Sequence, residues 1–351
     1  MNPNSRNYSK RDEEEKLPQD GIYSVVNEKQ KKFVLLPVDL AARVERAREH
    51  FVGPWLLLSG TMDRYITERL FGGWVHWHHV TLAKFGQLSV YYAYSRDVNL
   101  LTTRFDVGRN EEMYKRYAAA IPQVLKKSKG PLKLVTYPSY AVMKGVASYY
   151  TPPGGEDVVE VWEWDKKKSK KDVMEAIKQG KTVHYHAVAF GKYAEGVEFS
   201  DDAKDVNLPY SSYIEDASVQ KKSGKKSLLR TVVVAGVPIP NIFNDYYVDL
   251  GVHFGFITQK CAKELYRVAD LSEASKECRL QMIEWGYKQA EIAIRQIVGR
   301  AIRGPADSAT LYILDTRAPR SLINSICQNT HFDIKDCRDI PAEELLSPPQ
   351  P

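Results

Sequence analysis

Apolar residues in the last third of the chain recur at intervals of three and four positions. They are Ile283, Tyr287, Ala290, Ile294 and Ile297. This spacing puts them on one face of a single helix. The same periodicity predicts shorter helices over residues 40–51, 111–125 and 141–146, and around 173–177. Pro122 lies inside the second of these segments, so we expect a kink or an early end there.

Short apolar runs alternate with the predicted helices. They cover residues 32–36, 55–58, 88–94, 132–136, 158–164, 184–190, 231–235 and 309–314. The run from Thr231 to Ala235 is continuous, which is typical of a central strand buried on both faces. We expect the last run to close the sheet. Because strands alternate with helices, the sequence predicts an α/β fold: a mainly parallel sheet sandwiched by helices, with a ligand site at the carboxyl ends of its strands.

Composition narrows the class of protein only modestly. The 351 residues, 43% of them hydrophobic, can bury a large core and leave room for one large or two ordinary domains. The net charge of +6, from 50 basic and 44 acidic residues, permits nucleic-acid binding without establishing it. No apolar run approaches the length of a membrane span and the N-terminus is polar. We therefore expect neither a membrane segment nor a signal peptide.

The cysteines favour a reducing compartment. Cys261, Cys278, Cys327 and Cys337 lack the close spacing of zinc or iron–sulfur ligands. We expect buried or free thiols, and hence a soluble protein of the cytoplasm, or of the nucleus if the source is eukaryotic. Histidines at 76, 78 and 79 could offer two ligands from one strand face, but no acidic residue or thiol lies near them in the sequence. We expect no metal site.

The end of the long predicted helix carries a second, polar stripe. Gln296, Arg300 and Arg303 lie at positions i, i+4 and i+7 of this helix. Two guanidiniums one turn apart, next to Gly299, suit a phosphate that another surface brings close. A solvated basic helix face is the alternative, and the charges alone favour it.

Other stretches carry weaker signals for phosphate contacts. Ser59-Gly60-Thr61 follows a predicted strand, and Ser139 precedes a predicted helix, where helix capping would explain it equally well. The lysine-rich run 166–171 could touch a nucleic-acid backbone or form a solvated loop. Neither Gly180-Lys181-Thr182 nor Gly224-Lys225 completes a phosphate-binding loop, because each lacks the first glycine.

Several of these stretches resemble the motifs of one enzyme family, in that family's order. Gln296 to Arg303, with Asp307 and Asp315-Thr316-Arg317, resembles the sixth motif of superfamily 2 helicases in the form used by the XPD and DinG family. Stretches that resemble motifs III, IV and V are Leu58-Ser59-Gly60-Thr61-Met62, Tyr137-Pro138-Ser139-Tyr140 and Gly191 to Phe199; Thr103-Arg104-Phe105 and Gly236-Val237-Pro238 also resemble family segments. Glu198 stands where the family usually has aspartate, and Met62 where leucine is usual.

The resemblance implies a RecA-like fold and the second lobe of a two-lobe motor. Residues 1–28 contain few large apolar residues and no period, which predicts a loose arm. The resemblance divides the rest of the chain into the end of the first lobe (29–70), the second lobe (71–335) and a tail (336–351). In the family ATP lies between the lobes, so Arg300 and Arg303 would act as arginine fingers together with Gln296. Residues expected to couple nucleotide state to lobe closure are Ser59, Gly60, Thr61, Glu195, Gly196, Glu198 and Gly299. Residues expected near single-stranded DNA are Arg104, Tyr137, Ser139, Tyr140 and Lys192.

The family's phosphate loop, magnesium-binding motif and iron–sulfur cluster belong to the first lobe and have no counterpart in these residues. The resemblance therefore implies a chain that shares ATP and Mg²⁺ with a partner carrying the first RecA-like lobe, and that does not hydrolyse ATP alone. Two alternatives stay open. One is a non-catalytic nucleic-acid-binding or adaptor module derived from a helicase lobe. The other is a protein-interaction domain that uses the long polar loop from Ser200 to Leu228.

Overall fold

The backbone divides the chain into two compact units. A computed structural model describes residues 22–27, 32–37, 67–68, 86–103, 111–155, 157–165, 170–191, 227–240, 245–268, 271–304, 307–328 and 332–347. One unit comprises Met1–His78 with Asn241–Lys288, and the other His79–Pro240 with Gln289–Pro351. The second unit contains the predicted sheet.

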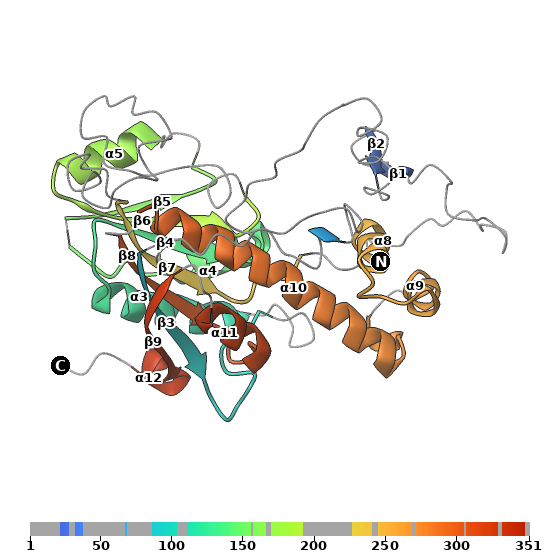
Figure 1. The fold of residues 1–351 in the computed structure, drawn as a ribbon. Helices are drawn as coiled ribbons and strands as arrows, with labels where there is room; N and C mark the ends of the chain where they lie inside the picture. Colours follow the sequence, from blue (N-terminus) through green and yellow to red (C-terminus); the bar gives the residue numbers. More distant parts are fainter. Residues whose placement is uncertain are drawn as a thin grey trace. The chain divides into compact units, whose positions relative to one another are not determined.

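This second unit is built on a seven-stranded sheet with the order β5-β6-β4-β7-β8-β3-β9 (Figure 1). The strands are β3 (Gln87–Tyr94), β4 (Leu132–Tyr137), β5 (Val158–Trp162), β6 (Thr182–Val188), β7 (Leu229–Ala235), β8 (Ser308–Leu314) and β9 (Asp333–Pro341). Every neighbouring pair is parallel, which confirms the predicted α/β sheet. The expectation that residues 309–314 close the sheet is wrong, because β3 and β9 continue it beyond β8.

Helices cover both faces of this sheet. They are α3 (Glu111–Lys127), α4 (Tyr140–Ala147), α5 (Lys170–Lys178), α11 (Arg320–Cys327), α12 (Ala342–Leu346) and the end of α10 (Lys276–Ala301). Apolar side chains of α3, α4 and α12 form one core with β4 and β7, and this core includes Ala93 of β3. Tyr92 points to the opposite face, and there the guanidinium of Arg320 from α11 lies 5.3 Å from its ring centroid. The sheet is therefore sandwiched by helices, as predicted.

Helix α3 shows how one buried face fixes an element on the sheet. Tyr117, Ile121 and Leu125 are fully buried along it, and the hydroxyl of Tyr117 donates to the carbonyl of Leu314 at 2.8 Å. The helix continues through Pro122 to Lys127, so the early end that we considered does not occur.

The last strand corrects the expectation of a tail from residue 336. Strand β9 pairs with β3 from Asp333 to Pro341, and Ala342 and Leu345 of α12 are buried. Most side chains of β9 are polar, as is common for an edge strand with solvent on one side. Because β9 is polar, its sequence contains no apolar run that would predict a strand.

Within the described residues, the other unit contains a two-stranded sheet and several helical segments. Strands β1 (Ile22–Asn27) and β2 (Lys32–Pro37) pair antiparallel, so the predicted loose arm is wrong for residues 22–27. Helices α8 (Asp245–His253) and α9 (Gln259–Leu265), the short η4 (Leu271–Glu273) and the start of α10 follow. The helix predicted at 40–51 and the strand at 55–58 lie outside the described residues. No helix in the described part is long and apolar enough to cross a membrane.

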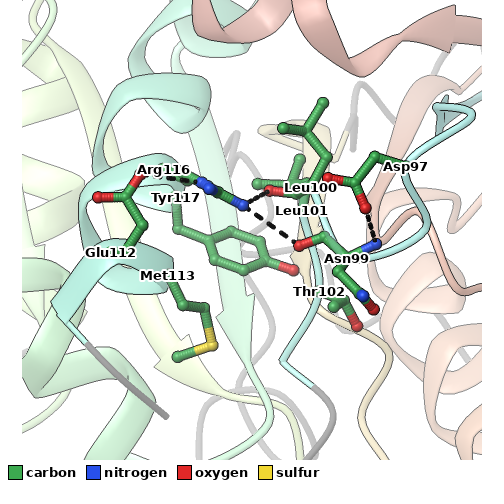
Figure 2. Close-up of a pocket in the computed structure, with 9 residues that line it drawn as sticks. All are labelled: Asp97, Asn99, Leu100, Leu101, Thr102, Glu112, Met113, Arg116 and Tyr117. Carbon is green, nitrogen blue, oxygen red and sulfur yellow. Dashed lines mark hydrogen bonds and ion pairs between the residues drawn. The ribbon is translucent and has the colours of Figure 1, made fainter. Parts of the chain in front are cut away.

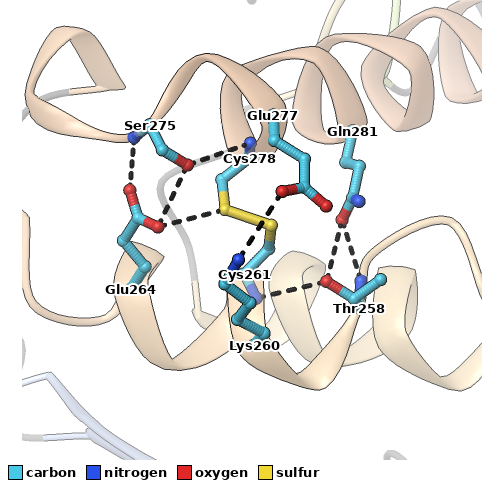
Figure 3. Close-up of a disulfide and its surroundings, with 8 residues drawn as sticks. All are labelled: Thr258, Lys260, Cys261, Glu264, Ser275, Glu277, Cys278 and Gln281. Atoms are coloured by element: carbon cyan, nitrogen blue, oxygen red, sulfur yellow. Dashed lines mark hydrogen bonds and ion pairs between the residues drawn. A yellow bond between two sulfur atoms is a disulfide. The ribbon is translucent and has the colours of Figure 1, made fainter.

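Two disulfides correct the expectation of free thiols. Cys261 of α9 is bonded to Cys278 of α10, and Cys327 of α11 to Cys337 of β9; all four cysteines lie in the described residues and none is free. Figure 3 shows the first bond between its two helices, beside hydrogen bonds that join Thr258 to Gln281. Separations of 17 and 10 residues carry no recognisable spacing signal, because each pairing is created by the packing of two elements.

Candidate functional site

The polar stripe lies at the carboxyl end of α10, opposite a buried face. The buried residues there are Ile294, Ile297, Val298 and Ala301. Gln296 is exposed, and Gly299 and Arg300 are half-buried. A Cβ added at Gly299 would meet nothing within 4 Å, so the surface beside Arg300 is open on the side of the described residues. Apolar packing therefore fixes the helix while the stripe faces outward.

Arg303 is held by a turn rather than by the helix. Helix α10 ends at Ala301, and Arg303 follows it as an exposed residue. Its backbone N–H donates to Oδ2 of Asp307 at 2.9 Å, and the N–H of Gly304 donates to the same atom at 2.9 Å. The predicted continuous helical stripe is thus correct for Gln296 and Arg300 but not for Arg303.

Three residues predicted to lie near DNA follow one another from the end of β4 to the start of α4. Ser139 is the N-cap of α4, and its hydroxyl accepts the N–H of Val142 at 3.3 Å, so the capping interpretation is correct for this side chain. Tyr140 is 47% exposed. Tyr137 is fully buried, with its hydroxyl 2.9 Å from Nδ1 of His186. Because a buried ring has no surface to offer a DNA strand, we treat Tyr137 as a core residue.

The residues at the end of α10 and those at the start of α4 lie at opposite ends of the parallel strands. Helix α10 leads into the amino end of β8, whereas Ser139 follows the carboxyl end of β4. Strands β4, β7 and β8 are parallel neighbours. Arg300 and Arg303 therefore lie near the amino ends of the strands. The expectation of a single site at the carboxyl ends of the strands is wrong for these two residues.

The other predicted site residues lie outside the described residues. They are Ser59, Gly60, Thr61, Arg104, Lys192, Glu195, Gly196 and Glu198. The histidines at 76, 78 and 79 also fall outside. Within the described ranges, no group of three or more His, Cys, Asp or Glu residues could hold a metal ion.

Sequence reasoning missed a buried polar cluster on β5 and β6. Nδ1 of His184 and Nε2 of His186 lie 2.8 and 2.7 Å from the two carboxylate oxygens of Glu160. A carboxylate only accepts, so both ring nitrogens donate. Burial raises the pKa of Glu160, but the hydrogen bonds from His184 and His186 outweigh this effect and lower the pKa to about 2. Burial lowers the pKa of His186, so its ring is neutral and its Nδ1 accepts a hydrogen bond from the hydroxyl of Tyr137. Two histidines two positions apart on a strand were the available signal.

A cavity of about 300 Å³ lies between the end of β3 and α3 (Figure 2). It is lined by Asp97, Asn99, Leu100, Leu101, Thr102, Glu112, Met113, Arg116 and Tyr117. Arg116 donates to Glu112 at 3.0 Å and to the carbonyls of Asn99 and Leu100 at 3.4 and 3.2 Å. These bonds hold its guanidinium in the wall of the cavity. The cavity follows the carboxyl end of β3, so it lies at the same edge as Ser139.

Comparison with known proteins identifies the family. Residues 121–223 and 223–330 match the helicase C-terminal domain family, which is more than half of the 351 residues. This chain belongs to that family. The residues Gln296 to Arg303 and Tyr137 to Tyr140 of the helicase domain lie inside the matched range, and Ser59 to Thr61 and Arg104 lie before it.

Two curated relatives are helicases. ATP-dependent DNA helicase XPD of Sulfolobus acidocaldarius is 25% identical over 265 residues, which cover 75% of this chain and 39% of that protein. ATP-dependent DNA helicase CHL1 of Saccharomyces cerevisiae is 29% identical over 146 residues, which cover 42% of this chain and 13% of that protein. The aligned part of this chain therefore spans much less than two thirds of the length of either relative.

Two solved structures share the fold. A structure of the XPD helicase has a TM-score of 0.55 at 21% identity, covering 87% of this chain and 46% of that chain. A structure of XPD in its apo form has a TM-score of 0.57 at 22% identity, covering 87% of this chain and 53% of that chain. The parallel α/β sheet is thus the RecA-like fold of XPD, and the chain contains a helicase C-terminal lobe of the XPD and DinG type.

Proposed function

We propose that this chain is the second lobe of an ATP-dependent DNA helicase and that Arg300 and Arg303 act as arginine fingers. The observation that carries the proposal is the position of half-buried Arg300 in the last turn of α10 and of exposed Arg303 just after this helix, within the family match; buried Ile297 and Val298 anchor the helix. Guanidiniums placed in this way stabilise the charge that develops on a transferred γ-phosphate. The relatives' names, ATP-dependent DNA helicases, support ATP and DNA as ligands.

A first RecA-like lobe completes the proposed site, either on a partner chain or elsewhere in a longer protein. ATP and Mg²⁺ would be shared with that lobe, because the 351-residue sequence contains no complete phosphate-binding loop. Gln296, Gly299 and Glu195 would couple the nucleotide to lobe closure. Tyr140 and Lys192 would contact single-stranded DNA.

The test is an ATPase assay on this chain, alone and mixed with a first-lobe protein that carries a phosphate loop. We expect no turnover by the chain alone and DNA-stimulated turnover in the mixture. Arg300→Ala or Arg303→Ala lowers kcat roughly 10³-fold or more, because a finger residue is lost. Arg279→Ala, near the other end of α10, is the matched control and leaves kcat unchanged. Turnover by the chain alone, or wild-type kcat in both finger variants, contradicts the proposal.

A non-catalytic module that binds nucleic acid is the second candidate function. The exposed ring of Tyr140 and the net charge of +6 favour it as much as they favour a motor. Binding of single-stranded DNA without turnover in any first-lobe mixture would support this candidate.

A further inference from the structure

We propose that Asp307 is a positioning residue that holds the end of α10, and with it Arg300 and Arg303, in one geometry. This inference rests on the proposed arginine-finger function. Asp307 lies just before β8 and is 3% exposed. It contacts neither nucleotide nor DNA in this proposal and acts through the backbone of the arginines.

The carboxylate of Asp307 accepts hydrogen bonds from two separate segments. Oδ2 accepts the N–H groups of Arg303 and Gly304, both at 2.9 Å, and Oδ1 accepts the N–H of Ser227 at 3.1 Å. Three backbone donors therefore converge on one buried side chain. An asparagine would turn an NH₂ group toward at least one of these donors, because an amide has only one acceptor atom.

Ser227 links the same carboxylate to the other arginine. Its hydroxyl lies 3.3 Å from the carbonyl oxygen of Arg300 and 3.4 Å from that of Leu229. The backbones of Arg300 and Arg303 are thus linked through Ser227, whose hydroxyl contacts Arg300 and whose N–H donates to Asp307, and through the carboxylate of Asp307. In addition, the N–H of Gln87 donates to the carbonyl of Asp307 at 2.8 Å, which fixes the turn to β3.

A carboxylate at this place has an electrostatic cost that its contacts must offset. The carboxyl end of a helix carries partial negative charge, so a buried anion there is disfavoured. Arg230 lies 3.5 Å from Oδ1 of Asp307 and donates to the carbonyl of Ser308 at 3.0 Å. The negative charge of Asp307 is therefore balanced by Arg230 of β7, and its acceptor oxygens remain available to the turn that carries Arg303.

The test compares Asp307→Asn with Asp339→Asn, an exposed aspartate of β9, in the full chain. Amide hydrogen exchange, followed by NMR, measures whether the N–H groups of Arg303 and Gly304 are protected. In Asp307→Asn we expect the exchange rates of these two amides to rise about tenfold or more, and that of Ile294 to stay unchanged. In the mixture with a first-lobe protein, kcat falls about 10²-fold while KM for ATP changes by less than about twofold, because misplaced fingers weaken the transition state and not ground-state binding. The control variant changes neither quantity.

Ser227→Ala provides a second variant in case Asp307→Asn does not fold. It removes the hydroxyl contacts with the carbonyls of Arg300 and Leu229 and keeps the backbone N–H that donates to Asp307. We expect the same direction and a smaller size for both effects. Unchanged exchange at Arg303 and Gly304, or accelerated exchange with wild-type kcat, overturns the inference. A wild-type mixture without any turnover contradicts the proposed function instead, and the exchange rates would still decide whether Asp307 holds the turn.

Discussion

Glu160 of β5 and His186 of β6 make the stability of the fold depend on pH. The folded chain holds the pKa of Glu160 at about 2, below its usual 4.5, and holds the pKa of His186 below its usual 6.5. Both groups bind fewer protons when folded than when unfolded, so stability decreases as pH falls. We expect the free energy of unfolding to decline first below pH 6.5, through His186, and more steeply below pH 4.5, through Glu160.

Urea unfolding between pH 8 and about pH 2 covers both pKa windows, and Glu160→Gln isolates the contribution of the carboxylate. Glutamine keeps the size but loses the charge and one acceptor, so we expect a loss of roughly 1–3 kcal/mol at neutral pH and a shallower decline in acid. Glu175→Gln, at an exposed position of α5, is the control. Identical pH profiles for Glu160→Gln and the wild type would show that the cluster does not set the acid sensitivity.

Gly236, which follows β7, is a position where only glycine fits. Its φ of 91° lies in the left-handed region, and an added Cβ would collide with the side chain of Thr103. Gly236→Ala should lower the free energy of unfolding by roughly 2–4 kcal/mol, since backbone strain and steric overlap add. Gly180→Ala has a similar φ of 80° with nothing within 4 Å of the new Cβ, so about 1 kcal/mol is expected there. Equal losses in urea unfolding would exclude the contact with Thr103 as a cause.

At the scale of elements, the sequence predicts what depends on local periodicity and misses what depends on pairing. The buried face of α10 and the continuous strand β7 follow from spacing and burial alone. Strand β9 is polar, so its place beside β3 depends on a pairing that no local pattern encodes. The Glu160 cluster requires the register in which Glu160 of β5 faces His184 of β6. Arg303 is predicted to lie on the helix. Helix α10 instead ends at Ala301, and Arg303 lies in a turn that is closed by Asp307.

The disulfide between Cys327 and Cys337 joins α11 to the edge strand β9. Cys337 is exposed, whereas Cys261 and Cys278 are fully buried. Dithiothreitol should therefore reduce the Cys327–Cys337 bond in the folded chain before the Cys261–Cys278 bond. Because each bond closes a short loop in the unfolded chain, its loss should lower the free energy of unfolding by about 3 kcal/mol.

Thiol titration and unfolding of paired serine variants check this prediction. The purified chain, unfolded without reductant, should show no reactive thiol. The double variant Cys327→Ser/Cys337→Ser should lose stability without altering reduction of the other bond. Four reactive thiols in the unreduced chain, or equal stability with and without reductant, would contradict the disulfides.

Across the whole sheet, the proposed nucleotide and DNA contacts are separated by the length of its strands. Arg300 and Arg303 lie near the amino end of β8, and Tyr140 follows the carboxyl end of β4. A strand of six or seven residues spans about 20 Å. Coupling between ATP and DNA in the proposed motor would therefore run along β4, β7 and β8, which are parallel neighbours, rather than through direct contact of the two groups.

Binding of single-stranded DNA tests the carboxyl edge independently of ATP. We expect the affinity of the full chain for oligo(dT), followed by fluorescence anisotropy, to fall steeply between about 50 and 200 mM salt, because phosphate contacts release counterions. Tyr140→Ala should weaken binding by about 1–3 kcal/mol through a lost base-stacking surface. Tyr149→Ala removes a comparably exposed ring, 41% against 47%, just beyond the other end of α4, and should bind normally. Salt-independent affinity would favour the protein-interaction alternative. Equal losses in both variants would contradict a DNA contact at the start of α4, the helix that Ser139 caps.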